Sequence, residues 1–550
     1  MDNTQYSKPI LQCLSLIEPI AIHGTDVTVH SLSYDSRKIR AGAAFFALPG
    51  VHTDGSIFID EAIKKGAAAI IHEEALESYR KDICYIQTAD IRAAMAAAAA
   101  AFFNEPSKDM ITIGITGTEG KTSTVDFIWQ LLRLTGKKAG FSSTVSYSFG
   151  EDAIPNPAHQ TTPESITVQE RLAGMRDNGC EYAVIEASSH GLSPRTARLL
   201  HVYFDIGVCM NVTQEHLEFH GTFEQYRYDK ANLFRNLEVH DHKKKAGNVM
   251  PFGVVNLEDP SAGYFAQATK QPVFGFSVMR TAGNPHTSYM TDIHKSQTAD
   301  DTTAPFKNYA GELYADNVKE QEQMLTFTIH TNLNGKQATW EASAPITGFF
   351  NVYNLLAALI VVHNVTGQPF DTLVPMLQRL VPVKGRMCRV DAGQDFEVLV
   401  DYAHTPSSFQ MILPPIRERI KAKKGKIIAV FGSGGERDTI KRPQQGKIAA
   451  EYCDYIVLTD EDPRGEDPYE LLETIAAGCP EKKRDRELFI IPHRPAAIRK
   501  AFSLAQKNDA VLLLGKGHEK SIIGREGAVP YDEYTEALNA LKELSRATVS

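Results

Sequence analysis

The segment Ile111–Ser123 limits the fold of this chain more than any other. An apolar run, ITIGIT over Ile111–Thr116, is followed directly by the polar sequence GTEGKT and then by apolar residues at helical spacing. The order strand, glycine-bearing loop and helix is typical of a phosphate-binding loop, in which N–H groups at the helix start bind phosphate. The segment therefore predicts a parallel α/β domain that binds a nucleotide.

The residue types in this loop suit the triphosphate of ATP and a divalent cation. Glycine lets the backbone approach phosphate, Lys121 can reach the terminal phosphates, and Thr122 is placed to bind Mg²⁺. The chain has Ile115 where the strict Walker pattern has glycine, so an ordinary glycine turn is the alternative interpretation. The predicted nucleotide-binding loop consists of Gly117, Thr118, Glu119, Gly120, Lys121, Thr122 and Ser123.

Three polar residues further along the chain are candidates for the same site. Glu186 lies in the apolar run Tyr182–Ala187, where a carboxylate can supply the hard oxygen ligand that Mg²⁺ prefers. His216 follows a third apolar run, Phe204–Asn211, and Lys230 lies in a segment with a helical pattern. For Glu186 and His216, a purely structural role is the alternative.

The chain of 550 residues is too long for one hydrophobic core. We predict three domains, over residues 1–108, 109–382 and 383–550. The first has short β-rich segments and an alanine-rich helix from Ile91, and the second contains a helix over Asn351–Thr366. Within the second domain, Val278–Gln323 is polar with little pattern, so we expect loops or an insertion there.

In the last domain, apolar runs alternate with helical segments, which predicts a parallel α/β sheet. Three polar loops, FGSGGERD, TDEDPRGEDP and GKGHEK, each follow one of these apolar runs. Ligands bind beyond the carboxyl ends of the strands in such sheets. We therefore expect the three loops to form the walls of one site.

The composition argues against several classes of protein. The chain has 58 basic and 67 acidic residues, a net charge of −9, which does not suit a nucleic-acid-binding protein. We find no secretory signal and no apolar stretch long enough to span a membrane, so we expect no membrane insertion. The 7 cysteines are scattered without a CxxC pair, which predicts reduced thiols and a cytoplasmic location.

Taken together, these motifs resemble the Mur ligases, specifically the UDP-N-acetylmuramoyl-tripeptide synthetases, over nearly the whole chain. The resemblance implies an α/β fold of three domains: an N-terminal UDP-binding domain, a central P-loop ATPase-like domain with a parallel sheet, and a C-terminal Rossmann-like domain. It also implies an ATP- and Mg²⁺-dependent enzyme of peptidoglycan synthesis. Its substrates would be UDP-N-acetylmuramoyl-L-alanyl-D-glutamate and a diamino acid.

The resemblance also implies contacts with the muramoyl substrate. The segment YDSRKIRAGAAFFALPGVHTDG is similar to the family's UDP-binding domain, and HQTTPE and EASSHGLSPR are similar to segments that hold the muramoyl-peptide. Relatives commonly have an arginine four residues after the leucine of the second segment, whereas here Arg195 comes three residues after it and Arg198 three further on. The implied substrate residues are Ser36, His52, Thr53, Thr161, Thr162, Ser188 and Arg195.

Further segments are similar to the family's catalytic and nucleotide-binding motifs. TGTEGKT resembles TGTNGKT with Glu119 in place of asparagine, and GRMC resembles GRME with its acid lost. Lys230 matches a lysine that is carbamylated in relatives; the alternative is an ammonium group paired with phosphate. The implied metal ligands are Thr122, Glu186, His216 and carbamylated Lys230, and the implied ATP contacts outside the loop are Asn351, Asn354, Arg386, Asp401 and His404.

The C-terminal loops are expected to select the amino acid. Members that add meso-diaminopimelate have Asp-Asn-Pro-Arg, whereas this chain has Asp462 in place of asparagine, followed by Arg464, which can bind a carboxylate through two hydrogen bonds. A carboxylate attracts ammonium, which favours L-lysine or L-ornithine. Arg437 and Glu519 resemble residues of diaminopimelate-adding enzymes, so that acid remains an alternative, and Arg437 could instead pair with Asp462. Gly515 completes the predicted amino-acid site.

Amide formation from a carboxylate requires activation, and ATP would supply it through an acyl phosphate. A folylpolyglutamate-synthetase-like ligase and a non-catalytic ATP-binding switch are the alternative functions. We expect a monomer. Because the implied ATP contacts are divided between the central and C-terminal regions, we also expect domain closure.

Overall fold

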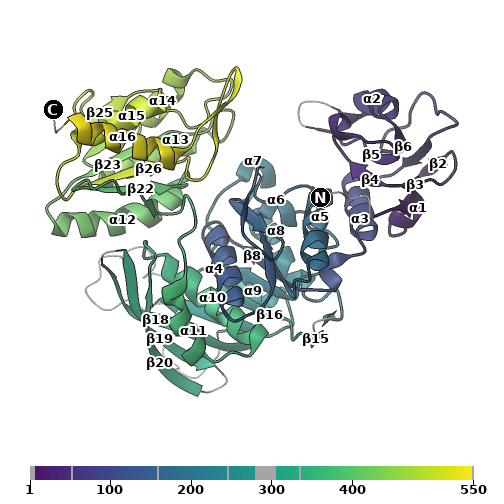
Figure 1. Ribbon diagram of the computed structural model, residues 1–550, viewed down its shortest axis with the longest axis horizontal. Helices are drawn as coiled ribbons and strands as arrows, with labels where there is room; N and C mark the ends of the chain where they lie inside the picture. The colour runs from purple at the N-terminus through teal and green to yellow at the C-terminus, as the bar shows by residue number, and fades with distance from the viewer. Residues whose placement is uncertain are drawn as a thin grey trace.

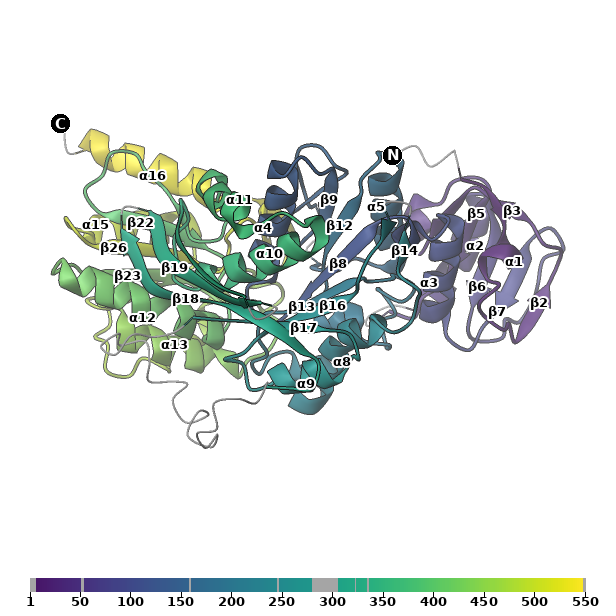
Figure 2. The ribbon, with the colours of Figure 1, turned by 90° about the horizontal axis from the view of Figure 1, so that it is seen from below.

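The computed structural model describes residues 6–50, 54–157, 160–244, 247–278, 305–321, 323–333 and 336–547. The chain forms three α/β domains that follow one another along its long axis, with the N-terminal domain at one end (Figures 1 and 2). This architecture confirms the predicted fold class. Among the described residues, no helix is both long enough and apolar enough to cross a membrane. All 7 cysteines are free.

The N-terminal domain is built on a five-stranded sheet of order β2-β7-β6-β5-β4. The predicted alanine-rich helix is α3, Ile91–Phe102, which begins at Asp90, whose carboxylate accepts a hydrogen bond from the N–H group of Ala93. The other elements are β1 (Lys8–Pro9), α1 (Ile10–Cys13), β2 (Ala21–His23), β3 (Thr28–Val29), β4 (Ser31–Ser33), β5 (Ala43–Phe46), α2 (Ile59–Lys64), β6 (Ala67–His72) and β7 (Cys84–Gln87).

The central domain contains an eleven-stranded sheet of order β11-β10-β9-β12-β8-β13-β16-β17-β18-β19-β20. Strand β8, Ile111–Thr116, pairs in parallel with β12 (Tyr182–Glu186) and β13 (Ile206–Cys209). Their carboxyl ends therefore lie next to one another. The remaining strands are β9 (Ala139–Ser142), β10 (Ser146–Ser148), β11 (Ile154–Pro155), β16 (Phe252–Asn256), β17 (Val273–Val278), β18 (Tyr309–Gln321), β19 (Met324–Leu333) and β20 (Lys336–Ala344), with a separate hairpin of β14 (Lys243–Lys244) and β15 (Gly247–Asn248).

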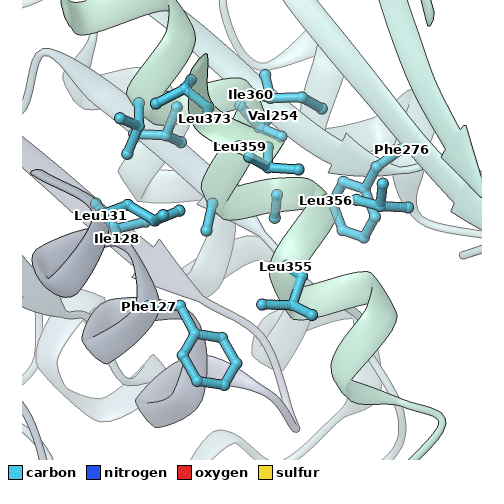
Figure 3. Close-up of a cluster of buried hydrophobic side chains, with 14 of the residues drawn as sticks. Phe127, Ile128, Leu131, Val254, Phe276, Leu355, Leu356, Leu359, Ile360 and Leu373 are labelled. Atoms are coloured by element: carbon cyan, nitrogen blue, oxygen red, sulfur yellow. The ribbon is translucent and has the colours of Figure 1, made fainter. Parts of the chain in front are cut away.

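Helices cover both faces of this sheet, which explains why the apolar run of β8 is continuous rather than alternating. One face packs against α4 (Lys121–Leu134) and α10 (Asn351–Thr366), and the other packs against α8 (Phe223–Asn236) and α9 (Ala262–Gln267). Figure 3 shows the first of these cores, where leucines of α10 meet Phe127 and Leu131 of α4 and Phe276 of β17. The domain also contains α5 (Ser165–Asp177), α6 (Ser189–Leu192), α7 (Leu217–His220) and α11 (Phe370–Met376).

The prediction of loops over Val278–Gln323 was wrong for the described part of its second half. Tyr309–Gln321 is one long strand, β18, which pairs with β17 on one side and with β19 on the other. Its first half alternates between buried and partly exposed residues, with Leu313 and Ala315 buried, whereas its second half alternates between partly exposed and exposed residues and is almost entirely polar. That mixture conceals the period of two that identifies a strand. Residues 279–304 lie outside the described part of the chain.

The C-terminal domain has a six-stranded sheet of order β21-β22-β26-β23-β24-β25, in which β21 alone is antiparallel to its neighbour. The predicted parallel sheet is thus confirmed, with one antiparallel edge strand. The strands are β21 (Cys388–Arg389), β22 (Glu397–Asp401), β23 (Ile427–Phe431), β24 (Tyr455–Leu458), β25 (Leu488–Ile490) and β26 (Ala510–Leu514), with a hairpin of β27 (Ser521–Gly524) and β28 (Gly527–Pro530). The helices are α12 (Pro406–Ala422), α13 (Lys441–Tyr452), α14 (Pro468–Ala476), α15 (Arg494–Leu504) and α16 (Glu533–Ala547).

Candidate active site

The phosphate loop lies at the carboxyl end of β8, between the ends of β12 and β13. Gly120 has φ +85°, and a Cβ atom there would lie 2.6 Å from Oδ1 of Asn354, so both the backbone angle and the space require glycine. The loop backbone is fixed by Asn211, whose Oδ1 accepts a hydrogen bond of 2.8 Å from the N–H group of Glu119. Lys121 begins α4, and its Nζ donates to the carbonyl of Thr118 at 2.7 Å.

Thr122 and Glu186 lie in direct contact beside this loop. The hydroxyl of Thr122 is 3.0 Å from Oε1 of Glu186, and Oε2 of Glu186 accepts hydrogen bonds from the N–H and hydroxyl groups of Thr144 at 2.8 and 3.0 Å. A buried carboxylate beside a hydroxyl is the hard oxygen donor set that suits Mg²⁺. Arg386 of the C-terminal domain reaches the same place, with Nη2 at 3.2 Å from the hydroxyl of Thr122.

Lys230 and His216 approach the site around the ring of Tyr226. The Nζ atom of Lys230 donates to the carbonyl of Gly117 at 2.7 Å and lies 4.5 Å from the centre of the Tyr226 ring. Burial, with Lys121 nearby, lowers the pKa of Lys230 to about 7. The His216 ring lies 6.4 Å from the Tyr226 ring, and its Nδ1 is 3.3 Å from Oε1 of Glu218.

A cavity of about 470 Å³ opens beside the phosphate loop, between the central and C-terminal domains. Asn354 lines it and is oriented by Asn351, whose Oδ1 accepts a hydrogen bond of 2.8 Å from Nδ2 of Asn354. Large apolar side chains from both domains give this cavity the character of a nucleobase site. Sequence reasoning missed these side chains, which are Phe349, Phe350, Tyr353, Met411 and Tyr452.

A second cavity, of about 530 Å³, is lined by charged groups and receives the three polar loops of the C-terminal domain. The loops meet because β26, β23 and β24 are neighbours in the sheet, as the sequence predicted. Ser407 lines both cavities, so they adjoin at the start of α12. The charged and histidine residues of this lining are Glu215, His216, Glu218, His404, Arg437, Asp438, Lys441, Glu461, Asp462, Arg464 and Glu519.

Lys516 organises the acidic wall of this second cavity. Its buried Nζ lies 2.8 Å from Oδ1 of Asp462 and 2.5 Å from Oε2 of Glu519. Asp462 therefore pairs with Lys516, and the alternative pairing with Arg437 is not the one observed. Burial raises the pKa of Glu461, and a Cβ atom at Gly515 would lie 2.8 Å from Oε2 of that glutamate, which explains the glycine.

Asp401 and His404 occupy different surroundings although they share one motif. The two oxygens of Asp401 accept backbone hydrogen bonds of 2.7 Å from Met387 and Ala403, so this carboxylate shapes the turn after β22. His404 lines the charged cavity, with Nδ1 2.9 Å from the carbonyl of Tyr402. Burial lowers the pKa of His404 to about 4, which keeps the ring neutral at pH 7.

The segments implied for the muramoyl-peptide meet at Thr162. Its hydroxyl contacts that of Ser188 at 2.9 Å, and its carbonyl accepts a hydrogen bond of 3.1 Å from Nη1 of Arg198. Arg195 instead donates to the carbonyl of Phe219 at 2.5 Å, so Arg198 is the arginine next to Thr162. Thr161 precedes this contact and is partly exposed.

The remaining implied substrate residues belong to the N-terminal domain. Ser36 is buried, and its hydroxyl donates to Glu61 at 3.2 Å. His52 and Thr53 lie outside the described residues.

One histidine cluster in the described chain has the spacing of metal ligands but already has other partners. It consists of Asp205, His240 and His242. The two ring nitrogens of His242 lie 2.8 Å from Asp205 and from the carbonyl of Leu237, and the Asp205 carboxylate is 3.1 Å from Nζ of Lys244. The lysine supplies the positive charge here, so we interpret the cluster as an ion-paired anchor.

Comparison with known proteins finds matches to three domains of one family. Residues 115–362 match the Mur ligase middle domain, residues 385–517 match the Mur ligase glutamate ligase domain, and residues 28–103 match the catalytic domain of the Mur ligase family. A Treponema denticola protein named UDP-N-acetylmuramyl-tripeptide synthetase is 54% identical, with 98% of each chain covered.

Two further relatives carry the name of a more specific reaction. A Geobacillus kaustophilus UDP-N-acetylmuramoyl-L-alanyl-D-glutamate–2,6-diaminopimelate ligase is 35% identical over 95% of this chain and 96% of its own. A solved structure of a ligase with the same name is 26% identical, with a TM-score of 0.56 and 94% and 95% of the two chains covered. The three domain matches and the relatives of equal length show that this chain is an ATP-dependent ligase and belongs to the Mur ligase family.

Proposed function

We propose that this chain joins a diamino acid, L-lysine or L-ornithine by preference, to UDP-N-acetylmuramoyl-L-alanyl-D-glutamate in peptidoglycan synthesis. The observation that carries the proposal is the position of the Thr122–Glu186 pair beside the phosphate loop, with one cavity suited to a nucleobase and an adjoining one lined by charge. The name of the 54% identical Treponema denticola relative, a UDP-N-acetylmuramyl-tripeptide synthetase, supports formation of a tripeptide without naming the amino acid that is added.

Under this proposal, each of the three predicted domains binds a different substrate group. Residues 1–108 would hold the UDP group through Ser36, His52 and Thr53. Residues 109–382 would bind ATP, and residues 383–550 would bind the amino acid. The muramoyl-peptide would lie along Thr161, Thr162 and Ser188, with Arg198 rather than Arg195 oriented toward Thr162.

In the proposed chemistry, the D-glutamate carboxylate attacks the terminal phosphate of ATP, which gives an acyl phosphate and ADP. The amine of the incoming amino acid then attacks the acyl carbon, an amide bond forms, and phosphate leaves. Lys121 and the loop N–H groups neutralise charge on the transferred phosphate. Arg386 adds a second cation on the opposite domain, next to Thr122.

The residues present suit a divalent cation, which would neutralise the phosphates and orient the attacking carboxylate. Thr122 and Glu186 offer oxygen donors, and His216 and Lys230 both lie beside the ring of Tyr226, with Lys230 bound to the carbonyl of Gly117 in the phosphate loop. Carbamylation would convert Lys230 from a cation into an anionic oxygen ligand. A pKa lowered to about 7 favours this change, since it requires a neutral amine.

The charge of the second cavity supports an amino acid with a net positive charge. Six carboxylates line it, those of Glu215, Glu218, Asp438, Glu461, Asp462 and Glu519, against the three cations Arg437, Lys441 and Arg464. L-Lysine and L-ornithine carry one more net positive charge than meso-diaminopimelate, whose second carboxylate would face this wall. Diaminopimelate remains the second candidate because Arg437 and Arg464 lie in the same cavity.

Phosphate release in the presence of ATP, Mg²⁺ and UDP-N-acetylmuramoyl-L-Ala-D-Glu tests the proposal. L-Lysine, L-ornithine and meso-diaminopimelate are compared in parallel, with controls that omit the muramoyl-peptide or the amino acid. Preference for lysine or ornithine is expected. Preference for diaminopimelate would keep the ligase assignment and overturn the assignment of lysine or ornithine. Phosphate release without a second substrate would indicate an ATPase switch instead.

A further inference from the structure

Glu119 is the residue of the phosphate loop that makes this loop unlike the related pattern TGTNGKT. Its backbone is fixed on both sides, because the N–H group donates to Oδ1 of Asn211 at 2.8 Å and the carbonyl accepts from Nδ2 of Asn211 at 3.2 Å. The side chain extends from this fixed backbone toward the C-terminal domain. Its Oε1 accepts a hydrogen bond of 3.1 Å from the hydroxyl of Thr405.

Thr405 is rigidly attached to its own domain. It is the N-cap of α12, where its hydroxyl accepts a hydrogen bond from the N–H group of Ser408 at 3.1 Å, and the hydroxyl of Ser408 accepts one in return from the N–H group of Thr405 at 3.0 Å. This reciprocal capping box fixes the start of the helix. A force on the Thr405 hydroxyl therefore acts on α12 as a whole.

The Glu119–Thr405 bond lies where closure of the two domains matters for nucleotide binding. Glu119 lines the 470 Å³ cavity together with Asn354 of the central domain and Met411 of α12. The cavity exists in this shape only while α12 lies against the phosphate loop. A bond that maintains this arrangement pre-organises the cavity before a nucleotide arrives.

An ionised carboxylate at position 119 costs free energy. Glu119 is half-buried, and loss of solvent around its carboxylate, together with nearby Glu215, raises its pKa to about 7, even though Lys121 and Arg386 act in the opposite direction. An asparagine would avoid this cost, but its side chain is one methylene group shorter. The longer side chain of glutamate makes the contact with Thr405, which offsets part of this cost.

We propose that Glu119 is a positioning residue that latches the C-terminal domain onto the phosphate loop through Thr405. The latch sets the affinity for the nucleotide and takes no part in the bond-making steps. The inference concerns nucleotide binding by the ligase and rests on the proposed function only for its effect on turnover. Removal of the latch favours an arrangement in which α12 has moved away from the phosphate loop. In that arrangement the nucleobase loses its contacts with α12.

Binding of a non-hydrolysable ATP analogue, AMPPNP with Mg²⁺, to the full chain by calorimetry tests the latch. Thr405→Val is measured in the natural background and in a Glu119→Ala background, because loss of the Glu119 charge alone changes affinity for a triphosphate. In the natural background, Thr405→Val should weaken AMPPNP binding about tenfold, the value of one charge-assisted hydrogen bond. In the Glu119→Ala background the same substitution should have little effect.

Two further variants separate the latch from the stability of α12. Thr405→Ser keeps the hydroxyl and should bind AMPPNP like the natural chain. Ser408→Ala weakens the capping box without touching Glu119 and should also leave the affinity unchanged. Equal weakening by Thr405→Val in both backgrounds, or weakening by Thr405→Ser or Ser408→Ala as large as that by Thr405→Val, would overturn the proposal.

Turnover gives an independent measurement where substrates are available. Thr405→Val should raise the KM for ATP about tenfold while kcat changes little, because the latch acts on binding. AMPPNP binding requires neither the muramoyl-peptide nor an amino acid. Failure of the latch and failure of the proposed substrates are therefore distinguishable.

Discussion

The Asp462 carboxylate lies 2.8 Å from the Nζ atom of Lys516 and also lines the charged cavity, so it has both a structural and a selective role. Asp462→Asn removes one negative charge from that wall, while Lys516 keeps its contact with Glu519. We expect the kcat/KM ratio of L-lysine to meso-diaminopimelate to fall about fivefold to tenfold, the effect of about 1 kcal/mol of charge interaction near a protein surface.

Phosphate-release kinetics with the two amino acids measure this ratio. Asp438→Asn is the matched control, since Asp438 lines the same cavity but is exposed to solvent. It should change the ratio much less. An unchanged ratio in Asp462→Asn would show that Lys516 already cancels the charge that the amino acid meets.

The lowered pKa of Lys230 leads to a prediction about the pH dependence of carbamylation. Its pKa is lowered to about 7, so the neutral amine that reacts with CO₂ becomes the main form as the pH rises through that value. In the presence of ¹³C-bicarbonate, a carbamate resonance of the protein should therefore grow as the pH rises through about 7. Lys230→Arg should abolish the resonance and lower turnover at least about 100-fold, as expected for loss of a metal ligand.

Lys244 provides the control for this measurement. It is also buried, and burial lowers its pKa, but the Asp205 carboxylate, 3.1 Å from its Nζ, opposes that shift. Lys244→Arg should leave the resonance in place. A resonance that survives in Lys230→Arg would assign the carbamate elsewhere, and its absence from the natural chain would leave Lys230 an ammonium group.

At the scale of elements, the sequence predicts strands and helices best where one pattern extends over the whole element. The apolar run Ile111–Thr116 and the helix Asn351–Thr366 have the same bounds in the structure as in the prediction. Strand β18 could not be found in this way, because its stability depends on pairing with β17 and β19 and its outer half is polar. The pairing of strands that are distant in the sequence cannot be predicted from a short segment of it.

The burial of helix α10 leads to a prediction about the stability of the central domain. Leu359 is fully buried between α4 and the central sheet, in the core that Figure 3 shows. Leu359→Ala should destabilise the central domain by about 2–5 kcal/mol, the sum of lost burial and the cavity left behind. Thermal denaturation should show a lower Tm, whereas Leu200→Ala, at a site 44% exposed, should change the Tm little. A loss below about 1 kcal/mol would mean that the core closes around the smaller side chain.

At the scale of the whole molecule, the motifs indicated candidate residues but not the contacts between domains. Arg386 was expected to bind ATP, whereas its contact with Thr122, 264 positions earlier in the chain, could be seen only in the folded molecule. The same holds for the apolar wall of the 470 Å³ cavity. Its side chains come from segments that no single motif joins, and their meeting depends on the placement of α12 against the central domain.

The division into domains predicts where a nucleotide stabilises the chain. Among the described residues, the core of the N-terminal domain includes Ile166 and Ala173 of α5 but no other part of the central domain, whereas the 470 Å³ cavity is lined only by residues from position 119 onward. A ligand at about 100 times its Kd stabilises the units that bind it by about 2.7 kcal/mol. Addition of AMPPNP and Mg²⁺ should therefore slow amide hydrogen exchange in α4, α10 and α12, while exchange in β5 and β6 stays unchanged.

Mass spectrometry of peptides after hydrogen exchange distinguishes these regions in one experiment. The muramoyl-peptide supplies the matched comparison, because its UDP group should protect β5 and β6 of the N-terminal domain instead. Equal protection of β5 and β6 by AMPPNP alone would contradict independent stabilisation. It would show that nucleotide binding is transmitted through α5, which packs against α3 of the N-terminal domain, and that the two substrates bind cooperatively.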